Sequence, residues 1–129
     1  MTAPSRKQVI ASWVVTALVA LFLAFDVTIH LLKPAPVIEA FTQLQLPIAM
    51  AVPVAIIELT CLVLFLLPRT TILGAILLTG YLGGAVLTNW RVGMPLGSTV
   101  LFPVYTGVLL WLGIWLRNEK LRALIPLQS

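Results

Sequence analysis

Four long apolar runs dominate this sequence of 129 residues and restrict what it can fold into. They cover about residues 9–32, 46–67, 70–90 and 98–116. In α-helical form, a run of about 20 residues is long enough to cross the roughly 30 Å hydrocarbon layer of a membrane. The strands of a membrane barrel would alternate apolar and polar residues, which these runs do not. The sequence therefore predicts an all-α protein, a four-helix transmembrane bundle.

The composition supports a membrane protein and excludes other classes. Hydrophobic residues make up 60% of the chain and charged residues 9%, whereas a soluble domain carries about a quarter charged residues. Such a chain is too apolar to be disordered or to be a small soluble enzyme. Arg6 and Lys7 before the first run resemble the start of a signal peptide, but the run is too long and lacks a cleavage site. We expect one membrane domain over residues 1–129.

The links between the runs contain turn residues and are short. They include Lys33–Pro36, Leu67–Arg69 and Gly93–Gly97. Short links join antiparallel neighbours, so they predict an up-down-up-down arrangement. The longer link contains a mildly amphipathic segment, residues 37–45, which we expect to lie in the membrane interface. Pro53 and Pro103 lie within the second and fourth runs, where we expect them to kink the helices.

The basic residues predict the orientation of the bundle. Lys33 and Arg91 lie at the ends of the runs that face one side of the membrane. The larger group lies at the ends that face the other side: Arg6, Lys7, Arg69, Arg117, Lys120 and Arg122. Because basic flanks stay in the cytoplasm, we expect a multi-pass membrane protein with both termini cytoplasmic. The net charge of +4 is scattered over single residues and pairs. This pattern points to the lipid bilayer as the partner and excludes nucleic acid.

Ionisable side chains are costly inside a membrane and mark candidate sites. Asp26 and His30 lie four residues apart, on one face of the first helix. With the second helix beginning near residue 46, Glu58 lies near the midplane, out of reach of Arg91 at the outer end of the third helix. We therefore expect Asp26, His30 and Arg91 to form an outward-facing polar cluster. This cluster is either a binding or proton-handling site or an ion-pair latch between helices.

Glu58 needs polar partners of its own at the expected depth. Tyr81, Asn89 and Thr60 are the candidates. The carboxyl group is either a proton-carrying or ligand-anchoring group or an acid that locks helix packing. Cys61, one turn away, is expected to be a buried filler because no positive charge near it would activate a thiol. The ligand spacing of a metal site is not recognisable, so we expect neither a metal nor a cofactor.

Small residues make the third helix slim on two sides. Gly80 and Gly84 form a small-x-x-x-small pair, and Gly83 lies on a second stripe. We expect these glycines to serve close helix packing, within the bundle or between protomers, with a ligand crevice as the alternative.

Several segments of the chain resemble the DoxX-like family of small bacterial membrane proteins. The resemblance implies a multi-pass protein of the inner (plasma) membrane. The resemblance covers roughly residues 12–127 and includes Glu58, at a place where the family tends to have an acid. The segments are Leu31–Pro36, Leu67–Thr70, Leu73–Ala75, Gly80–Val86, Thr88–Arg91 and Leu121–Pro126. The family's third helix commonly closes with Thr-His-x-Arg, whereas this chain has Asn89 at the His position. The resemblance implies that a proton step depending on that His is absent here, unless His30 compensates, because an amide does not titrate.

Three hypotheses about function remain open. The resemblance to DoxX-type proteins, some of which are linked to quinone-dependent sulfur oxidation or thiol stress, implies a non-catalytic or accessory subunit with a membrane redox partner or as a homo-oligomer. The second is a binder of, or enzyme acting on, a small lipophilic molecule such as a quinone, near Glu58 and Tyr81. The third is a small proton-coupled exporter; its dual-topology form is disfavoured by the basic bias.

Overall fold

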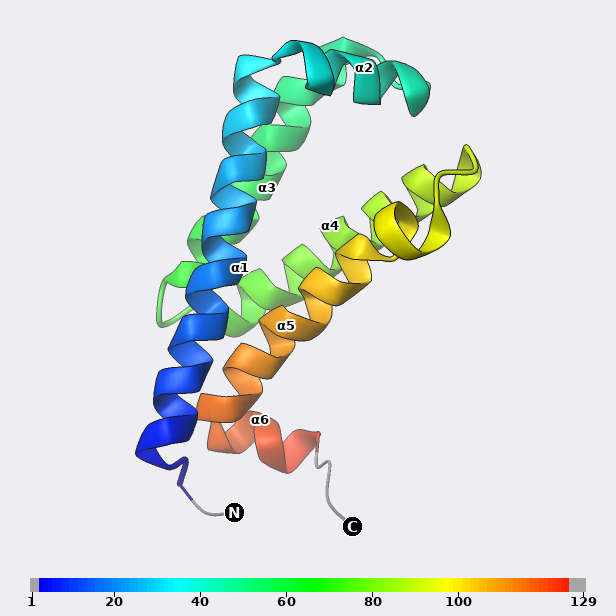
Figure 1. Ribbon diagram of the computed structural model, residues 1–129. Helices are drawn as coiled ribbons and strands as arrows, with labels where there is room; N and C mark the ends of the chain where they lie inside the picture. Colours follow the sequence, from blue (N-terminus) through cyan, green and yellow to red (C-terminus); the bar gives the residue numbers. More distant parts are fainter. Residues whose placement is uncertain (1–2, 126–129) are drawn as a thin grey trace.

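The computed structural model describes residues 3–125, and over this range it is all-helical (Figure 1). Four segments within the range are long and apolar enough to cross a membrane: residues 6–32, 48–66, 71–91 and 96–117. The predicted all-α bundle with four membrane-length helices is confirmed. The elements in chain order are α1 (Arg6–Leu32), α2 (Ala35–Gln43), the 3-10 turn η1 (Ile48–Met50), α3 (Ala51–Leu66), α4 (Thr71–Arg91), the π-turn η2 (Leu96–Val100), α5 (Phe102–Arg117) and α6 (Glu119–Leu124).

Local sequence signals set both ends of α1. Ser5 is its N-cap and forms a capping box with Gln8, in which each side chain bonds the other residue's backbone N–H. At the other end, Lys33 has a φ of 52° in the left-handed region, and Pro34 follows. A proline disfavours helical backbone at the residue before it, so the chain turns here into α2.

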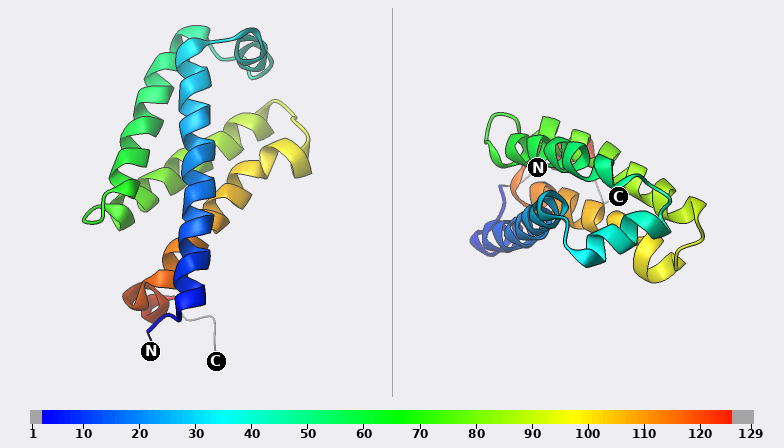
Figure 2. Two further views of the ribbon diagram at one scale, coloured as in Figure 1. Left: turned by 60° about the vertical axis from the view of Figure 1, so that its left-hand side comes forward. Right: turned by 90° about the horizontal axis from the view of Figure 1, so that it is seen from above.

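The four long helices pack in a ring. α1 packs against α3 and α5, and α4 completes the ring by packing against α3 and α5. Figures 1 and 2 show α1 and α3 side by side, with α4 and α5 diverging from them toward the end where α2 lies. The short helix α2 lies across that end of the bundle. The start of α1 and helix α6 lie together at the opposite end.

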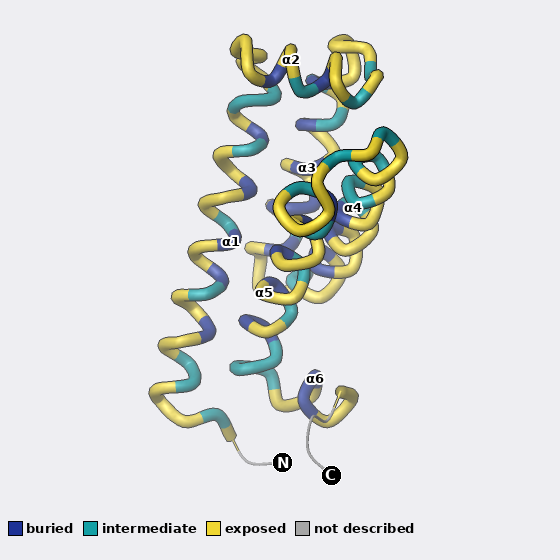
Figure 3. The backbone as a smooth tube through the Cα atoms, turned by 45° about the vertical axis from the view of Figure 1, so that its right-hand side comes forward, coloured by how far each residue is buried: buried dark blue, intermediate teal, exposed yellow. Residues whose placement is uncertain are grey.

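The core lies where the four helices converge, and the outer surface is equally apolar. Buried residues recur along α1, about one in each turn (Figure 3). They are Ser12, Thr16, Val19, Leu23 and Val27. On the opposite face Leu18 and Leu21 are 63% and 69% exposed, as expected for side chains that meet lipid. Cys61 is buried in the core beside Leu62 and Phe65, as expected for a filler.

The two prolines stand at helix starts and not in helix interiors. Pro53 is the third residue of α3, directly after η1, and Pro103 is the second residue of α5, directly after η2. The first turn of a helix has no intrahelical partner for its N–H groups, so a proline fits there without breaking a bond. The expected kinks are therefore replaced by irregular turns ahead of α3 and α5, and α3 begins five residues later than the apolar run suggests.

The glycines that mediate tight packing are not the ones that the sequence singled out. A Cβ added at Gly80, Gly83 or Gly84 would meet no described atom within 4 Å. The prediction that these three glycines serve close packing within the bundle is therefore wrong for residues 3–125. A Cβ at Gly74 would lie 2.2 Å from the backbone nitrogen of Phe65, and one at Gly113 would lie 2.7 Å from Thr16 Oγ1. No repeating motif marks Gly74 or Gly113 in the sequence.

Candidate functional site

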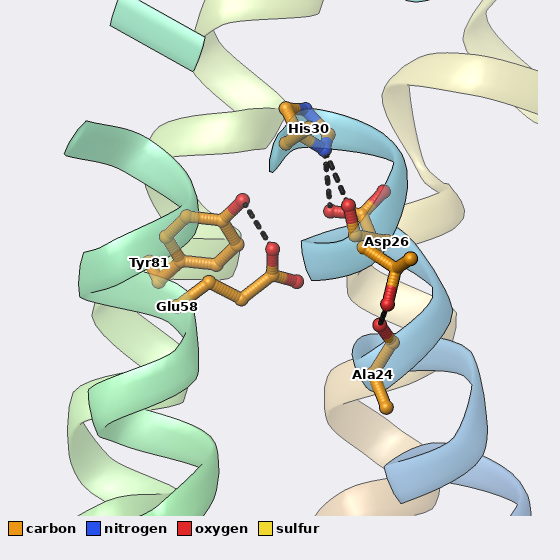
Figure 4. Close-up of polar contacts among 6 residues, drawn as sticks. Ala24, Asp26, His30, Glu58 and Tyr81 are labelled. Atoms are coloured by element: carbon orange, nitrogen blue, oxygen red, sulfur yellow. Dashed lines mark hydrogen bonds and ion pairs between the residues drawn. The ribbon is translucent and has the colours of Figure 1, made fainter. Parts of the chain in front are cut away.

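Asp26 and His30 share one face of α1 near its C-terminal end (Figure 4). His30 Nδ1 lies 2.6 Å from the backbone oxygen of Asp26 and 3.4 Å from its carboxylate Oδ2. A carbonyl oxygen only accepts, so Nδ1 carries the hydrogen and Nε2 keeps its lone pair in the neutral ring. The His30 ring also packs edge-to-face with the ring of Phe41 of α2, and the ring centroids are 5.6 Å apart. The imidazole is therefore held from two sides.

Glu58 and Tyr81 face this pair from α3 and α4. The Tyr81 hydroxyl donates to Glu58 Oε1 over 3.3 Å, and Glu58 is 1% exposed. Of the partners considered from the sequence, only Tyr81 forms this bond. Thr60 donates to the backbone oxygen of Ile56, and Asn89 donates to that of Ala85.

The structure brings Glu58 into the same cluster as Asp26 and His30. One ligand atom from each of the three lies within 4.8 Å of the other two. The sequence-based prediction that Glu58 lies deeper in the membrane than Asp26, apart from Asp26 and His30, is therefore wrong. Because α3 begins at Ala51, Glu58 is seven residues from the helix start, or about 10 Å deep at 1.5 Å per residue. Asp26 is six residues from the end of α1, or about 9 Å deep, so the two carboxyl groups lie at one level.

Arg91 does not join the cluster. Its guanidinium Nη2 donates to the backbone oxygen of Leu44, at the C-cap of α2. Within residues 3–125, the ion pair formed by Asp26 is with His30 and not with Arg91. The expected triad of Asp26, His30 and Arg91 is therefore corrected to Asp26, His30 and Glu58. Arg91 instead ties the end of α4 to the end of α2.

A cavity of about 450 Å³ lies beside the cluster, in the space between α4 and the ends of α1, α2 and α3. Asp26 and His30 form its α1 wall, and Tyr81 and Asn89 are among the α4 residues that face it. The cavity lining from α2 to the start of α3 is apolar and consists of Phe41, Leu44, Leu46, Met50 and Val54. Gly80 and Gly84 complete the α4 wall, so their lack of side chains leaves this space open. The crevice was the alternative use considered for these glycines.

A second cavity, of about 490 Å³, has a different character. It lies along α4, α5 and α6 and is lined almost entirely by apolar side chains, with Gly83 among its residues. Trp111, one of the lining residues, donates its ring N–H to Thr79 Oγ1 and so has no donor left for a ligand. An apolar groove inside a bilayer accommodates lipid chains. The cavity beside Asp26 is therefore the better candidate for specific binding.

The polar groups of the candidate site keep hydrogen-bonding capacity for a ligand. Asn89 uses one amide hydrogen on Ala85 and retains a second hydrogen and its oxygen. Tyr81 donates its hydroxyl hydrogen to Glu58 and can still accept. Two carboxyl groups and an imidazole close together inside an apolar bundle can hold protons or a cation, or orient a polar ligand group. Membrane proteins seldom retain such a group without a use for it.

The sequence model of the DoxX-like family matches residues 14–113 of the chain. The chain belongs to the DoxX-like family. This membership confirms the resemblance inferred from the third helix and supports a multi-pass membrane protein. No curated protein and no solved structure matches this DoxX-like protein.

Sequence reasoning missed the contribution of α2 to the site. The amphipathic pattern of residues 37–45 predicts a segment in the membrane interface, and the structure has helix α2 there, with Val37 and Phe41 buried. The pattern does not show that Phe41 packs against His30 or that Leu44 accepts a bond from Arg91. In this DoxX-like protein Asn89 lies on the cavity wall, at the position where the resemblance implies a His.

Proposed function

We propose that this DoxX-like protein binds a small lipophilic molecule with a polar head, such as a quinone, in the cavity beside Asp26 and His30. The observation that carries the proposal is that Asp26, His30, Tyr81 and Asn89 all line this cavity, and that a carboxylate oxygen of Glu58 lies within 4.8 Å of ligand atoms of Asp26 and His30. A volume of about 450 Å³ is within the usual range of small-molecule sites, about 300–1,000 Å³.

The cavity walls suit the two ends of such a molecule. Apolar side chains of α2 and α3 can cover a ring, and the polar side chains of α1 and α4 can bond its oxygen atoms. Asn89 retains an amide hydrogen that can be donated to a carbonyl, and His30 Nε2 can accept from a hydroxyl group. Glu58 is a carboxyl group that can exchange a proton with the ligand through Tyr81. Proton exchange and carbonyl bonding are what a quinone site requires.

Binding is tested with metal-free purified protein in detergent and a labelled short-tailed quinone in equilibrium dialysis. Glu58→Gln replaces the titratable carboxyl group by an amide, and Tyr81→Phe removes the hydroxyl group from the cavity wall. We expect each to raise the dissociation constant about tenfold, which corresponds to about 1.4 kcal/mol. The matched controls are Glu39→Gln and Tyr105→Phe. Glu39 is exposed on α2, and Tyr105 donates to Gly97 outside the cavity.

The outcome that contradicts the proposal is equal affinity for the wild type, Glu58→Gln and Glu39→Gln. Mass spectrometry of lipid extracts gives a second test, because a specific site retains quinone through purification. A preparation without bound quinone, together with unmeasurable binding, argues against the cavity as a quinone site.

The accessory-subunit hypothesis is favoured by one feature of α4. Gly83 has no described atom within 4 Å of where its Cβ would lie, so this face of α4 remains available for close approach by another helix. This hypothesis predicts a partner that co-purifies after gentle solubilisation and is lost in Gly83→Leu. A homo-oligomer that shows turnover without other subunits would contradict it.

The proposed orientation in the inner membrane places both termini in the cytoplasm, following the basic residues. A reporter that is active only outside the cytoplasm should be inactive when fused after the C-terminus and active when inserted at Met94. The opposite pattern would reverse the orientation. Equal activity at both places would indicate dual topology and revive the exporter hypothesis.

A further inference from the structure

We infer that Asp26, His30 and Glu58 form a binding site for a divalent transition-metal cation of the Zn²⁺ or Mn²⁺ class. The first support is the donor set. One imidazole and two carboxyl groups, from two different helices, place a ligand atom each within 4.8 Å of the others. A nitrogen and two carboxylate oxygens are ligands that Zn²⁺ and Mn²⁺ both accept. The sequence shows no recognisable ligand spacing because the third ligand, Glu58, comes from another helix.

The second support is the charge of the site. Glu58 is 1% exposed, and the side chain of Asp26 is 25% exposed. Two carboxyl groups at this depth must either hold protons or have their charge balanced by a cation. Among the described residues, the ion pairs include no Lys or Arg at either carboxylate, and His30 is the available cationic partner of Asp26. A divalent cation would balance both carboxylates while leaving the imidazole neutral.

The third support is the arrangement around the ligands. His30 Nδ1 lies 3.4 Å from Asp26 Oδ2, so the imidazole is already turned toward the carboxylate beside it (Figure 4). Tyr81 donates to Glu58 Oε1 and so orients that carboxyl group. Asp26 and His30 border the cavity, which gives water or a ligand access to further coordination positions. The bond from Tyr81 is of the kind that orients metal ligands in proteins.

The test uses Zn²⁺ and Co²⁺ alone, with the full chain in detergent and a purification tag free of His. After treatment with a chelator, the protein is dialysed against buffered Zn²⁺ and its metal content is measured by mass spectrometry. We expect one Zn²⁺ per chain. Co²⁺ should give visible absorption bands that Zn²⁺ abolishes. Asp26→Asn, His30→Gln and Glu58→Gln should each weaken binding more than tenfold, and Tyr81→Phe should weaken it about tenfold, as for a residue that orients a ligand.

Glu39→Gln is the control for loss of a surface carboxylate and should bind as the wild type does. A wild type that binds no Zn²⁺, or that binds it no better than the three ligand variants, overturns the inference. If a ligand variant fails to fold, the Co²⁺ spectrum of the wild type still decides, since its absence excludes the site. The assay contains no quinone and the quinone assay contains no metal, so either proposal can fail without the other.

Discussion

Gly74→Ala is expected to destabilise the protein by about 3 kcal/mol, at the upper end of the range for overpacking a tight contact. The added Cβ would lie 2.2 Å from the backbone nitrogen of Phe65, 2.5 Å from its Cα and 2.7 Å from the carbonyl carbon of Leu64. These are backbone atoms, so no side-chain rotation relieves the clash. The first turn of α4 would have to move away from α3, against the bond from Thr70 Oγ1 to the Leu64 oxygen.

The measurement is the free energy of unfolding in mixed micelles, with the folded fraction followed by circular dichroism. Gly80→Ala is the matched control in the same helix, because its Cβ would meet no described atom within 4 Å. Alanine in a helix interior is favoured over glycine by about 0.5–1 kcal/mol, so this control should be neutral or stabilising. Equal stability of Gly74→Ala and the wild type would contradict the close approach of α3 and α4.

Gly113→Ala is the second substitution with a large expected effect, a loss of about 2 kcal/mol. Its Cβ would lie 2.7 Å from Thr16 Oγ1 at the crossing of α1 and α5. Thr16 cannot turn away without loss, because Arg117 Nη1 donates to the same oxygen over 2.7 Å. Arg117 also lies over the ring of Trp13, 4.1 Å from its centroid. The substitution therefore disturbs both the packing and the polar contact that joins the two helices.

A double-mutant cycle separates the clash from a general loss of stability. Thr16→Ala removes the oxygen that the new Cβ meets, so Gly113→Ala should cost about 1 kcal/mol less in that background. Gly107→Ala on the same helix is the control, since its nearest described atom, Leu82 Cδ1, lies 3.7 Å away in ordinary contact. An additive cycle would show that Thr16 and Gly113 do not meet.

The candidate site was predicted in part, and its errors have one cause. Asp26 and His30 share a face because they are four residues apart, which the sequence shows directly. Placing Glu58 required knowing where α3 begins, and an apolar run does not distinguish a helix from the 3-10 turn before it. Once α3 begins at Ala51, Glu58 lies level with Asp26, and Arg91 contacts Leu44 instead.

The prediction of which glycines mediate close packing was wrong for a related reason. A small-x-x-x-small motif indicates that a helix face is slim, but not whether another helix approaches it. Gly80 and Gly84 face a cavity, whereas Gly74 and Gly113 occupy contacts that arise from the hairpin of α3 and α4 and from the crossing of α1 and α5. Such contacts depend on how two helices meet, which neither helix encodes alone.

The amino-acid sequence by itself determined that the chain is a membrane protein with four spans that contain a few ionisable groups. Run length and the cost of unpaired backbone groups in lipid are properties of each segment alone. Which face of each helix points inward was decided only by the tertiary structure. Lipid is as apolar as the core, so no contrast between polar and apolar faces marks the inside; packing alone brings Asp26, His30 and Glu58 together.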